Sequence, residues 1–337
     1  MKILENISLK PFNTFGIDKK AAFFTTVSSI EELKDALSWA NDHNLPVLIL
    51  GGGSNILLTQ EVKGLVIKIE ILGIQVIEET ENEVFVEVGA GQSWHEWVQI
   101  SIANKWAGIE NLSLIPGTVG ASPMQNIGAY GVELKDVFQS LKALNKKSLE
   151  VIDFSFDECE FGYRESVFKH QFKDQFVITS VTFRLQKQPK LNLDYGTIRE
   201  TLKEMGIHNP GIKEVSNAVI QIRKSKLPDP VEIGNAGSFF KNPTIDSTTF
   251  EKLLKRFPTL PNYPNENGIK IPAGWLIEQA GWKGKKIGNV GVHEKQALVL
   301  VNYGNGSGEE IKSLAQQIQN DILQKFGIDL HTEVNFI

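Results

Sequence analysis

The sequence has very little cysteine, no excess of basic residues and no long apolar run. Its single cysteine, Cys159, excludes an internal disulfide and a multi-cysteine zinc site, which is typical of a reducing compartment. The formal net charge of -5 argues against nucleic acid, because proteins that bind its phosphates usually carry a basic stripe. No apolar segment is long enough for a signal peptide or a membrane span, since Lys68 and Glu70 interrupt the apolar stretch 65–77. We therefore expect a cytoplasmic protein with no nucleic-acid or membrane partner.

Length and composition indicate a large globular protein. The 337 residues are 41% hydrophobic and 22% charged, which is sufficient for a sizeable core and roughly two or three domains. No internal repeat or low-complexity tract interrupts the chain. Helical and strand patterns are mixed along it, so we predict an α+β architecture instead of one doubly wound sheet.

Capping residues predict where several helices begin. Ser28 or Ser29 precedes a helical pattern that stops near Asn44. A Ser-x-x-Glu capping box begins a second helix at Ser93, and we expect Gly108 to end it. Later in the chain we expect a helix before Pro228, one capped by Asp246, and one capped by Ser307 and ended by Gly327. Strands are expected over residues 134–187 and in the tail, residues 328–337.

The stretch VLILGGGSNILL, residues 47–58, runs from aliphatic residues into three glycines. Glycines let backbone amide groups approach an anion closely, so a nucleotide phosphate is one ligand for such a loop. The fingerprint of a doubly wound dinucleotide fold would need a third glycine at position 56, but Ile56 stands there, and a strand-like pattern follows. That fold is therefore disfavoured, and a plain strand-end turn remains the alternative.

Residues 109–133 contain four glycines and two prolines but too many apolar residues for a disordered linker. A long ordered loop of this kind is usually functional. The residues FGYRES, 161–166, place Arg164 between an aromatic and an acidic residue, where it could bind a carboxylate or phosphate or simply form a salt bridge. The basic residues near Lys226 likewise suit either a solvated helix end or a diphosphate.

Two further residues are ambiguous when they are considered alone. Ser238, in NAGSFFKNP, is not a nucleophile elbow, because Phe240 occupies the position of the second glycine. It could donate a proton or bind a ligand, or it could be an ordinary surface serine. Glu333 on the tail strand is either a solvated carboxylate or part of a site.

Six motifs occur in an order that resembles one family of enzymes. They are PFNTFGID, LILGGGSNILL, GIENLSLIPGTVGASPMQNIGAYGVE, FGYRES, RKSKLPDP and NAGSFFKNP. Together they span nearly the whole chain and are similar to the UDP-N-acetylenolpyruvoylglucosamine reductases, also called UDP-N-acetylmuramate dehydrogenases. Tyr195, in LDYGTI, resembles the mobile tyrosine loop of one of the two classes of this family. The chain is identified as a member of that class.

The resemblance implies a fold and a division into domains. The expected fold is the FAD-binding fold of the vanillyl-alcohol-oxidase type, followed by a C-terminal α+β substrate-binding domain. Residues 1–66 would form the first FAD-binding subdomain, completed by the strand 328–337, and residues 67–222 would form the second. Residues 223–327 would form the substrate-binding domain.

The resemblance also implies a non-covalent FAD, NADPH as reductant, and reduction of the enolpyruvyl ether of UDP-N-acetylglucosamine to UDP-N-acetylmuramate for bacterial peptidoglycan. NADPH and the UDP-sugar would take turns in one cleft. Arg164 and Glu333 would act around the substrate carboxylate, and Ser238 would be the proton donor. The cofactor residues implied are Gly51, Gly52, Gly53, Ser54, Asn55, Ile115, Pro116, Gly117, Gly120, Ser122, Gln125, Asn126 and Gly128. The substrate residues implied are Tyr195, Lys226, Asn242, Tyr263 and Gln296.

One departure and two alternatives accompany this identification. Asn335 stands where relatives usually carry a basic residue, which puts the packing of the last strand in doubt. A flavin oxidase of the same fold is the nearest enzymatic alternative, although the glycine loop contains no histidine or cysteine that would tether FAD. A flavin or UDP-sugar sensor that keeps the pockets without catalysis is the other, and the presence of all three reaction residues argues against it.

Overall fold

The computed structural model describes residues 1–265 and 268–337, which form two compact units. Unit 1 comprises Met1–Ile7, Ala21–Gly52 and Lys63–Ser225, whereas unit 2 comprises Ser8–Lys20, Gly53–Val62 and Lys226–Ile337. Both units contain helices and strands, so the predicted α+β class is confirmed. The units group the chain differently from the three predicted domains, whose boundaries stay a prediction.

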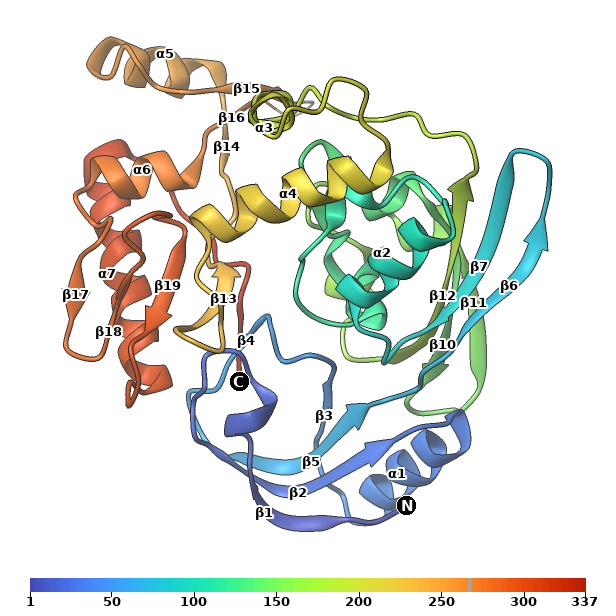
Figure 1. Ribbon diagram of the computed structural model, residues 1–337. Helices are drawn as coiled ribbons and strands as arrows, with labels where there is room; N and C mark the ends of the chain where they lie inside the picture. The colour runs from blue at the N-terminus through green and yellow to red at the C-terminus, as the bar shows by residue number, and fades with distance from the viewer. Residues whose placement is uncertain (266–267) are drawn as a thin grey trace. The chain divides into compact units, whose positions relative to one another are not determined.

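The first sheet of unit 1 has the strand order β1-β2-β5-β3, and helix α1 packs on it (Figure 1). Its elements are β1 (Leu4–Ser8), β2 (Lys20–Val27), α1 (Ile30–Asp42), β3 (Val47–Leu50) and β5 (Val62–Ile69). The hydroxyl of Ser29 accepts a hydrogen bond from the backbone N–H of Glu32, which confirms the predicted cap. Leu33 and Leu37 on α1 are buried in one core with Leu65 and Ile67 of β5, the strand that pairs in parallel with β3. Burial of these apolar side chains holds the helix on the sheet.

The second sheet of unit 1 is antiparallel throughout, in the order β11-β10-β12-β7-β6. Its strands are β6 (Ile74–Glu79), β7 (Glu83–Gly89), β10 (Phe138–Asn145), β11 (Val151–Ser155) and β12 (Phe176–Gln186). Helix α2 (Trp94–Ala103) covers it with Trp94 and Trp97, whose rings lie 6.0 Å and 5.4 Å from the ring of Phe183. These three aromatic side chains are almost fully buried and anchor α2 to the sheet.

Helix α2 ends earlier than the sequence predicted. Its Ser93 cap is present, since the hydroxyl accepts a hydrogen bond from the backbone N–H of Glu96. The last helical residue is Ala103, and the side chain of Asn104 donates to the carbonyl of Ile100. Lys105 then adopts a left-handed conformation with φ of 62°, so the predicted end at Gly108 is wrong.

The long glycine-rich segment is ordered, as predicted, and consists of tight turns. The turns are Glu110–Leu112, Val119–Ala121 and Pro123–Gln125, and they are followed by β8 (Gly128–Ala129) and β9 (Val132–Glu133). Unit 1 is completed by α3 (Ile198–Glu204) and by α4 (Ile212–Lys226), whose last residue belongs to unit 2. The two helices share a small core of their own.

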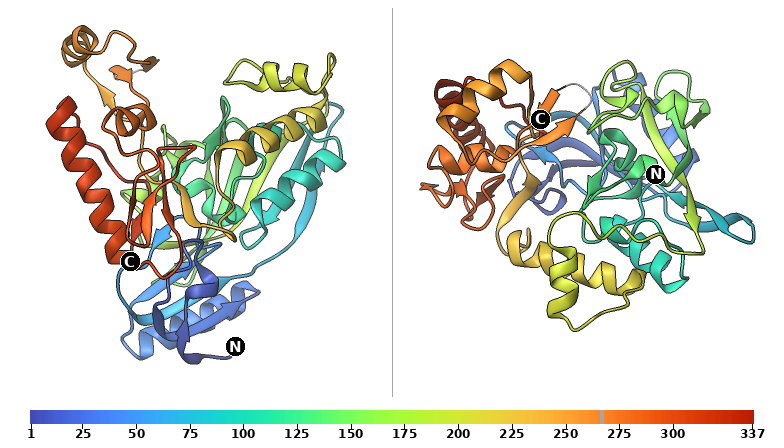
Figure 2. Two further views of the ribbon diagram at one scale, coloured as in Figure 1. Left: turned by 60° about the vertical axis from the view of Figure 1, so that its left-hand side comes forward. Right: turned by 90° about the horizontal axis from the view of Figure 1, so that it is seen from above.

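Unit 2 is built on the antiparallel sheet β13-β19-β18-β17, with the long helix α7 against β18 and β19 (Figure 2). These elements are β13 (Gly234–Ser238), β17 (Lys286–Ile287), β18 (Val290–Val292), β19 (Val299–Asn302) and α7 (Gly308–Phe326). A smaller sheet combines β14 (Thr244–Ile245), β15 (Tyr263–Asn265) and β16 (Gly268–Lys270) near α5 (Ser247–Arg256) and α6 (Ala273–Gln279). Asp246 caps α5, as predicted.

The tail is less regular than predicted. Only Asn335–Phe336 forms a strand, β20, which pairs in parallel with β4 (Ile56–Leu57). The preceding residues pair instead with the chain after β13, through the bridge between Phe240 and Thr332. The predicted strand 328–337 is therefore shortened, because two different partners share the segment. Among the described residues, no helix is both long and apolar enough to cross a bilayer.

The cap of α7 generates the first prediction. The Ser307 hydroxyl accepts a hydrogen bond from the N–H of Glu310, and the Glu310 carboxylate accepts from the N–H and the hydroxyl of Ser307. We expect Ser307→Ala to lower the free energy of unfolding by about 1 kcal/mol, because the N–H of Glu310 loses its acceptor and the Glu310 carboxylate loses one of its two donors. Urea unfolding measures this change in the free energy of unfolding. Ser313→Ala, in the exposed middle of the same helix, is the control and should cost nothing. Equal losses in both variants would contradict the prediction.

Candidate functional site

In unit 1, Gly51 and Gly52 lie at the end of β3 against the backbone of a second loop. A Cβ atom at Gly52 would lie 2.8 Å from the Cα atom of Gly117, and one at Gly51 would lie 2.6 Å from Oγ1 of Thr118. No real side chain tolerates the first of these distances, so glycine is required for the two loops to meet. The contact sets backbone amide groups of two loops near one another, which is the arrangement that binds a phosphate.

The second half of the glycine loop belongs to unit 2. Gly53 has a φ of 62°, and a Cβ there would lie 2.0 Å from the carbonyl oxygen of Phe12, so this glycine is required by both conformation and space. Ser54 is partly buried, and the amide nitrogen of the Asn55 side chain donates to the carbonyl of Glu333 over 3.2 Å. No helix follows this loop, since Ile56 begins β4, and the doubly wound alternative is excluded.

The predicted cofactor residues of the long segment all lie in unit 1 and fall into two parts. Ile115, Pro116 and Gly117 precede the turn that carries Gly120, whose Cβ would lie 2.5 Å from the Cβ of Ala90. The other part consists of Ser122, Gln125, Asn126 and Gly128. The hydroxyl of Ser122 donates to the carbonyl of Val119 over 2.6 Å, which fixes this turn from within. The role of Ser122 is therefore at least partly to hold this turn in shape.

Arg164 occupies the tip of a tight hairpin in which Gly162 and Glu165 exchange backbone hydrogen bonds. Its φ of 85° is unusual for a residue with a side chain, and such backbone strain is concentrated at functional sites. The guanidinium donates to the carbonyl of Gly128 over 2.7 Å and to that of Asn126 over 3.5 Å. The side chain is thus held in one orientation by backbone carbonyl groups.

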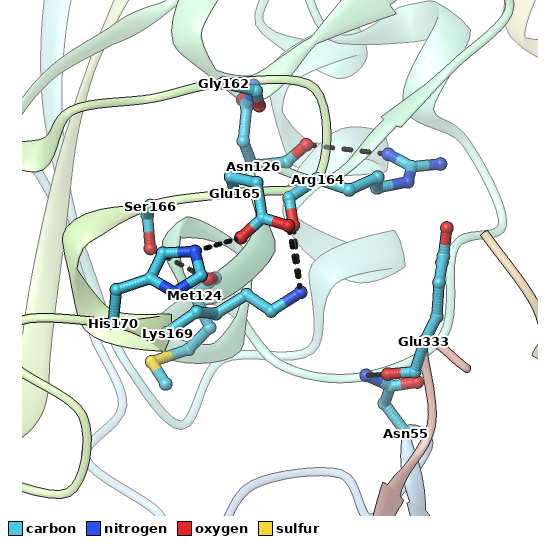
Figure 3. Close-up of polar contacts among 10 residues, drawn as sticks. All are labelled: Asn55, Met124, Asn126, Gly162, Arg164, Glu165, Ser166, Lys169, His170 and Glu333. Atoms are coloured by element: carbon cyan, nitrogen blue, oxygen red, sulfur yellow. Dashed lines mark hydrogen bonds and ion pairs between the residues drawn. The ribbon is translucent and has the colours of Figure 1, made fainter. Parts of the chain in front are cut away.

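A network of hydrogen bonds supports this hairpin (Figure 3). The side-chain amide of Asn126 donates to the carbonyl of Gly162 over 2.9 Å and to the carboxylate of Glu133 over 2.9 Å. The Nζ atom of Lys169 donates to the carbonyl of Arg164 over 3.0 Å. Asn126 is fully buried and left-handed, with φ of 42°, so it links the long segment to the Arg164 hairpin.

One of the basic residues near Lys226, Arg223, also lies in unit 1, and the sequence left it open whether it belongs to a solvated helix end or meets a diphosphate. The Nε atom of Arg223 is buried and has no hydrogen-bond partner in the part of the chain that the structure describes. Burial lowers the pKa of its guanidinium, Tyr130 opposes this shift, and the positive charge of Arg164 adds to it. A buried guanidinium nitrogen without a partner suits an anionic ligand. Helical spacing explains the burial, because Arg223 follows the buried Val219 by four residues on α4.

Tyr195 is half-exposed and close to Tyr130, with ring centroids 6.5 Å apart in an edge-to-face arrangement. Asn192 holds this loop by donating from its side chain to the carbonyl of Gly131 over 2.9 Å. Burial raises the pKa of Tyr130, whereas the charge of Arg223 opposes that shift. Within unit 1 the structure therefore gathers Arg223, Tyr130 and Tyr195, while the mobility of the tyrosine loop stays a prediction.

In unit 2 the structure brings Ser238 and Glu333 together. The N–H of Glu333 donates to the carbonyl of Phe239 over 2.9 Å, which places Glu333 beside the residue that follows Ser238. The pairing of β13 with β19 is irregular just before Ser238, and Gly237 has a φ of 68°. This bulge leaves Ser238 exposed while Phe239 is buried. The residues that carry the hydroxyl (Ser238) and the carboxyl group (Glu333) thus lie on adjoining chain segments that are far apart in the sequence.

The predicted substrate residues of unit 2 lie on neighbouring elements. The side-chain oxygen of Asn242 accepts a hydrogen bond from the N–H of Ala273, at the start of α6, over 2.9 Å. The side-chain oxygen of Gln296 accepts from Leu298 over 3.3 Å and also lies near the start of this helix, beside Gly274. Tyr263 is half-exposed on β15, and Lys226 is exposed at the end of α4.

Unit 1 contains a cavity of about 200 Å³ that fits part of a dinucleotide cofactor. Gly51, Thr118 and Gly120 line it together with the aliphatic residues of β3 and aromatic residues near the start of β12. A Cβ atom at Gly51 or Gly120 would collide with its neighbours, so the glycines let the two loops approach around this space. A polar backbone region joined to an apolar cavity suits a phosphate joined to a flat ring.

Comparisons with known sequences agree with this organisation. Residues 21–153 match the model of an FAD binding domain, and residues 229–337 match that of a UDP-N-acetylenolpyruvoylglucosamine reductase C-terminal domain. A protein from Flavobacterium johnsoniae with the name UDP-N-acetylenolpyruvoylglucosamine reductase is 52% identical, with 100% of each chain covered. A protein of the same name from Pseudomonas syringae pv. syringae is 49% identical, with 99% of each chain covered.

Solved structures support the fold. A UDP-N-acetylenolpyruvylglucosamine reductase from Thermus caldophilus matches with a TM-score of 0.69 and 23% identity, covering 99% of this chain and 98% of the other. A 6-hydroxy-D-nicotine oxidase from Arthrobacter nicotinovorans matches with a TM-score of 0.51 and 11% identity, covering 98% of this chain and 86% of the other. The predicted FAD-binding fold of the vanillyl-alcohol-oxidase type is confirmed. Its sequence relatives and family models show that the chain belongs to the UDP-N-acetylenolpyruvoylglucosamine reductase family of FAD-dependent oxidoreductases.

Proposed function

We propose that this enzyme uses NADPH and a non-covalently bound FAD to reduce the enolpyruvyl ether of UDP-N-acetylglucosamine to UDP-N-acetylmuramate. The reaction would supply a precursor of bacterial peptidoglycan in the cytoplasm. The names of relatives that match the chain over its whole length support this reaction. The observation that carries it in the structure is the strand pairing that sets Glu333 beside the residue following Ser238.

The chemistry explains why a guanidinium, a carboxyl group and a hydroxyl are needed. When it is bound and reduced, FAD supplies the hydride for the outer vinyl carbon of the substrate. Negative charge then develops on the carbon next to the substrate carboxylate, so the site must stabilise an enolate and afterwards protonate it. Arg164, held by the carbonyl groups of Gly128 and Asn126, would supply positive charge to that carboxylate.

Ser238 would donate the proton that completes the reduction. Its exposed position beside a bulge leaves the hydroxyl accessible to a ligand, and Glu333 would help to polarise the enolate. A serine hydroxyl is a weak acid, so its transfer of a proton requires neighbours that stabilise the resulting alkoxide. Lys226 or a water molecule could meet this need.

FAD would occupy the glycine-lined cavity of unit 1. Gly51, Gly52 and Gly120 would surround the diphosphate, together with Gly53, Ser54 and Asn55 from the second half of the loop. The remaining cofactor residues, around the Asn126 network, would position the flavin ring. The match of residues 21–153 to an FAD binding domain supports this placement, because it includes both loops.

The UDP group would be bound mainly by unit 2. Lys226 supplies one cation, while Asn242, Tyr263 and Gln296 supply neutral hydrogen-bonding groups for two phosphates and a sugar. Tyr195 would close over the bound substrate and exclude water. We further propose that NADPH and the UDP-sugar enter the same cleft in turn, which requires ping-pong kinetics.

Ser238→Ala separates the two half-reactions. Reduction of the bound flavin by NADPH should be nearly unchanged, because that half needs no proton from Ser238. Reoxidation by the enolpyruvyl substrate should slow by about 10²–10⁴-fold, the usual contribution of a general acid. Anaerobic stopped-flow absorbance of the flavin measures both halves.

Two controls make this experiment decisive. Ser247→Ala, at the exposed start of α5, should change neither half-reaction. Equal loss in both halves of Ser238→Ala would remove Ser238 from the role of proton donor. If the wild-type protein stays bleached after the substrate is added, the proposed reaction fails and a sensor function gains support.

Gly52→Ala tests the glycine cradle. The added methyl would lie 2.8 Å from the Cα atom of Gly117, so the two loops must separate. We expect FAD to bind at least tenfold more weakly, because the amide groups around the diphosphate then move apart. Quenching of flavin fluorescence on titration measures the dissociation constant. Gly211→Ala, which meets only the flexible end of Glu214, is the matched control, and equal effects would contradict the assignment.

A further inference from the structure

The start of helix α2 holds the chain segment that ends at Gly117. The first residue of the helix, Trp94, holds both ends of this segment. Its indole N–H donates to the carbonyl of Leu112 over 2.9 Å, and its backbone N–H donates to the carbonyl of Gly117 over 3.1 Å. The second residue, His95, holds the middle, because its Nδ1 atom accepts a hydrogen bond from the backbone N–H of Leu114 over 3.0 Å. The segment is therefore attached to the start of α2 at three points.

The middle point carries backbone strain. Leu114 has a φ of 61°, a left-handed conformation that a residue with a side chain rarely adopts. Such a conformation persists only where neighbouring groups hold it, and the hydrogen bond to His95 is one such contact. Residues 115–117 follow directly, and Gly117 makes the close contact with Gly52. A change of Leu114 to an ordinary φ would carry these residues away from that contact.

We propose that His95 is a positioning residue for the cofactor, because the hydrogen bond that it accepts from Leu114 keeps residues 115–117 where they meet the first glycine loop. This inference rests on the proposed placement of FAD at the glycines. The atom that matters is Nδ1, since a backbone N–H needs an acceptor at that place and a ring of the same size without one leaves it unpaired.

Only the neutral imidazole can serve as this acceptor, with its proton on Nε2, because both ring nitrogens are donors in the charged form. Burial lowers the pKa of His95, and the positive charges of Arg223 and Lys224 on α4 add to this shift. The carboxylate of Glu96, the next residue of α2, opposes it. His95 is therefore neutral near pH 7 and loses its role as acceptor only in acid.

Three substitutions of His95 separate the acceptor atom from the rest of the side chain. The side-chain oxygen of asparagine lies the same number of bonds from Cα as Nδ1, whereas that of glutamine lies one bond farther and leucine has none. We expect His95→Leu and His95→Gln to raise the dissociation constant of FAD about tenfold at pH 8, and His95→Asn to leave it nearly unchanged. Titration of the flavin-free full-length chain with FAD, followed by flavin fluorescence, measures the constant.

The same titration at lower pH tests the protonation of His95. The pKa of this group lies below the ordinary value of about 6.5, so the affinity of the wild-type chain for FAD should fall as the pH drops below about 6.5. His95→Asn keeps an acceptor that does not titrate, so its affinity should fall less over the same range. Equal falls in the two chains would overturn the proposal.

His208→Asn is the matched control, since His208 is exposed in the turn after α3. It should leave both the dissociation constant and its dependence on pH as they are in the wild type. Hydrogen exchange of the flavin-free chain then monitors the segment directly. The amide of Leu114 should exchange faster in His95→Leu than in the wild type or in His95→Asn, and equal exchange in all three would show that His95 does not hold the segment.

The remaining outcomes also decide the matter. Equal weakening of FAD by His95→Asn and His95→Leu would mean that the ring acts by its shape, and the inference would be wrong. If His95→Leu does not fold, His95→Gln alone is compared with His95→Asn. Gly52→Ala separates failure of this inference from failure of the cofactor placement. Weaker FAD binding in that variant, without an effect at His95, keeps the glycine cradle, whereas no effect at either position refutes both.

Discussion

Close contact between two backbone segments is the constraint on which unit 1 depends. Gly52 and Gly117 approach so closely that a Cβ at position 52 would lie 2.8 Å from the neighbouring Cα atom, and Gly120 meets Ala90 in the same way. These contacts join the ends of β3 and β7 to the turn that carries Gly120, and no other residue type fits them. The result is a concentration of backbone amide groups beside an apolar cavity. Dinucleotide binding at this place would therefore be a consequence of packing as well as of the residues that touch the ligand.

Backbone strain and buried charge accumulate in a second region of the same unit. Arg164 and Asn126 both have positive φ, and their hydrogen bonds to the carbonyl groups of Gly128 and Gly162 hold the strained conformations. Arg223 adds a guanidinium whose Nε atom is buried without a partner in the described chain, and its pKa is lowered by that burial. Two cations near one another are unfavourable until an anion joins them. The region is thus preorganised for negative charge.

Local signals in the sequence predicted local structure well. The helix caps at Ser29, Asp246 and Ser307 are confirmed, because a capping hydrogen bond depends only on residues within one turn. The predicted end of α2 at Gly108 was wrong, because Asn104 already caps the helix. The neighbourhood of Ser238 and Glu333 depends on pairing between distant segments, so the residue patterns alone could not predict it, and only the family resemblance suggested it.

The proposed reaction explains why the cofactor would be held by its far end. In that reaction the flavin would stay bound while NADPH and the UDP-sugar replace one another, so its reacting face would have to remain open to both. Contacts near that face cannot be numerous without blocking one of the two partners. Binding energy from a remote, non-reacting part of the cofactor avoids this conflict. The apolar cavity beside the glycine loops would provide such energy, and Arg164 and the hydroxyl of Ser238 would then serve the substrate alone.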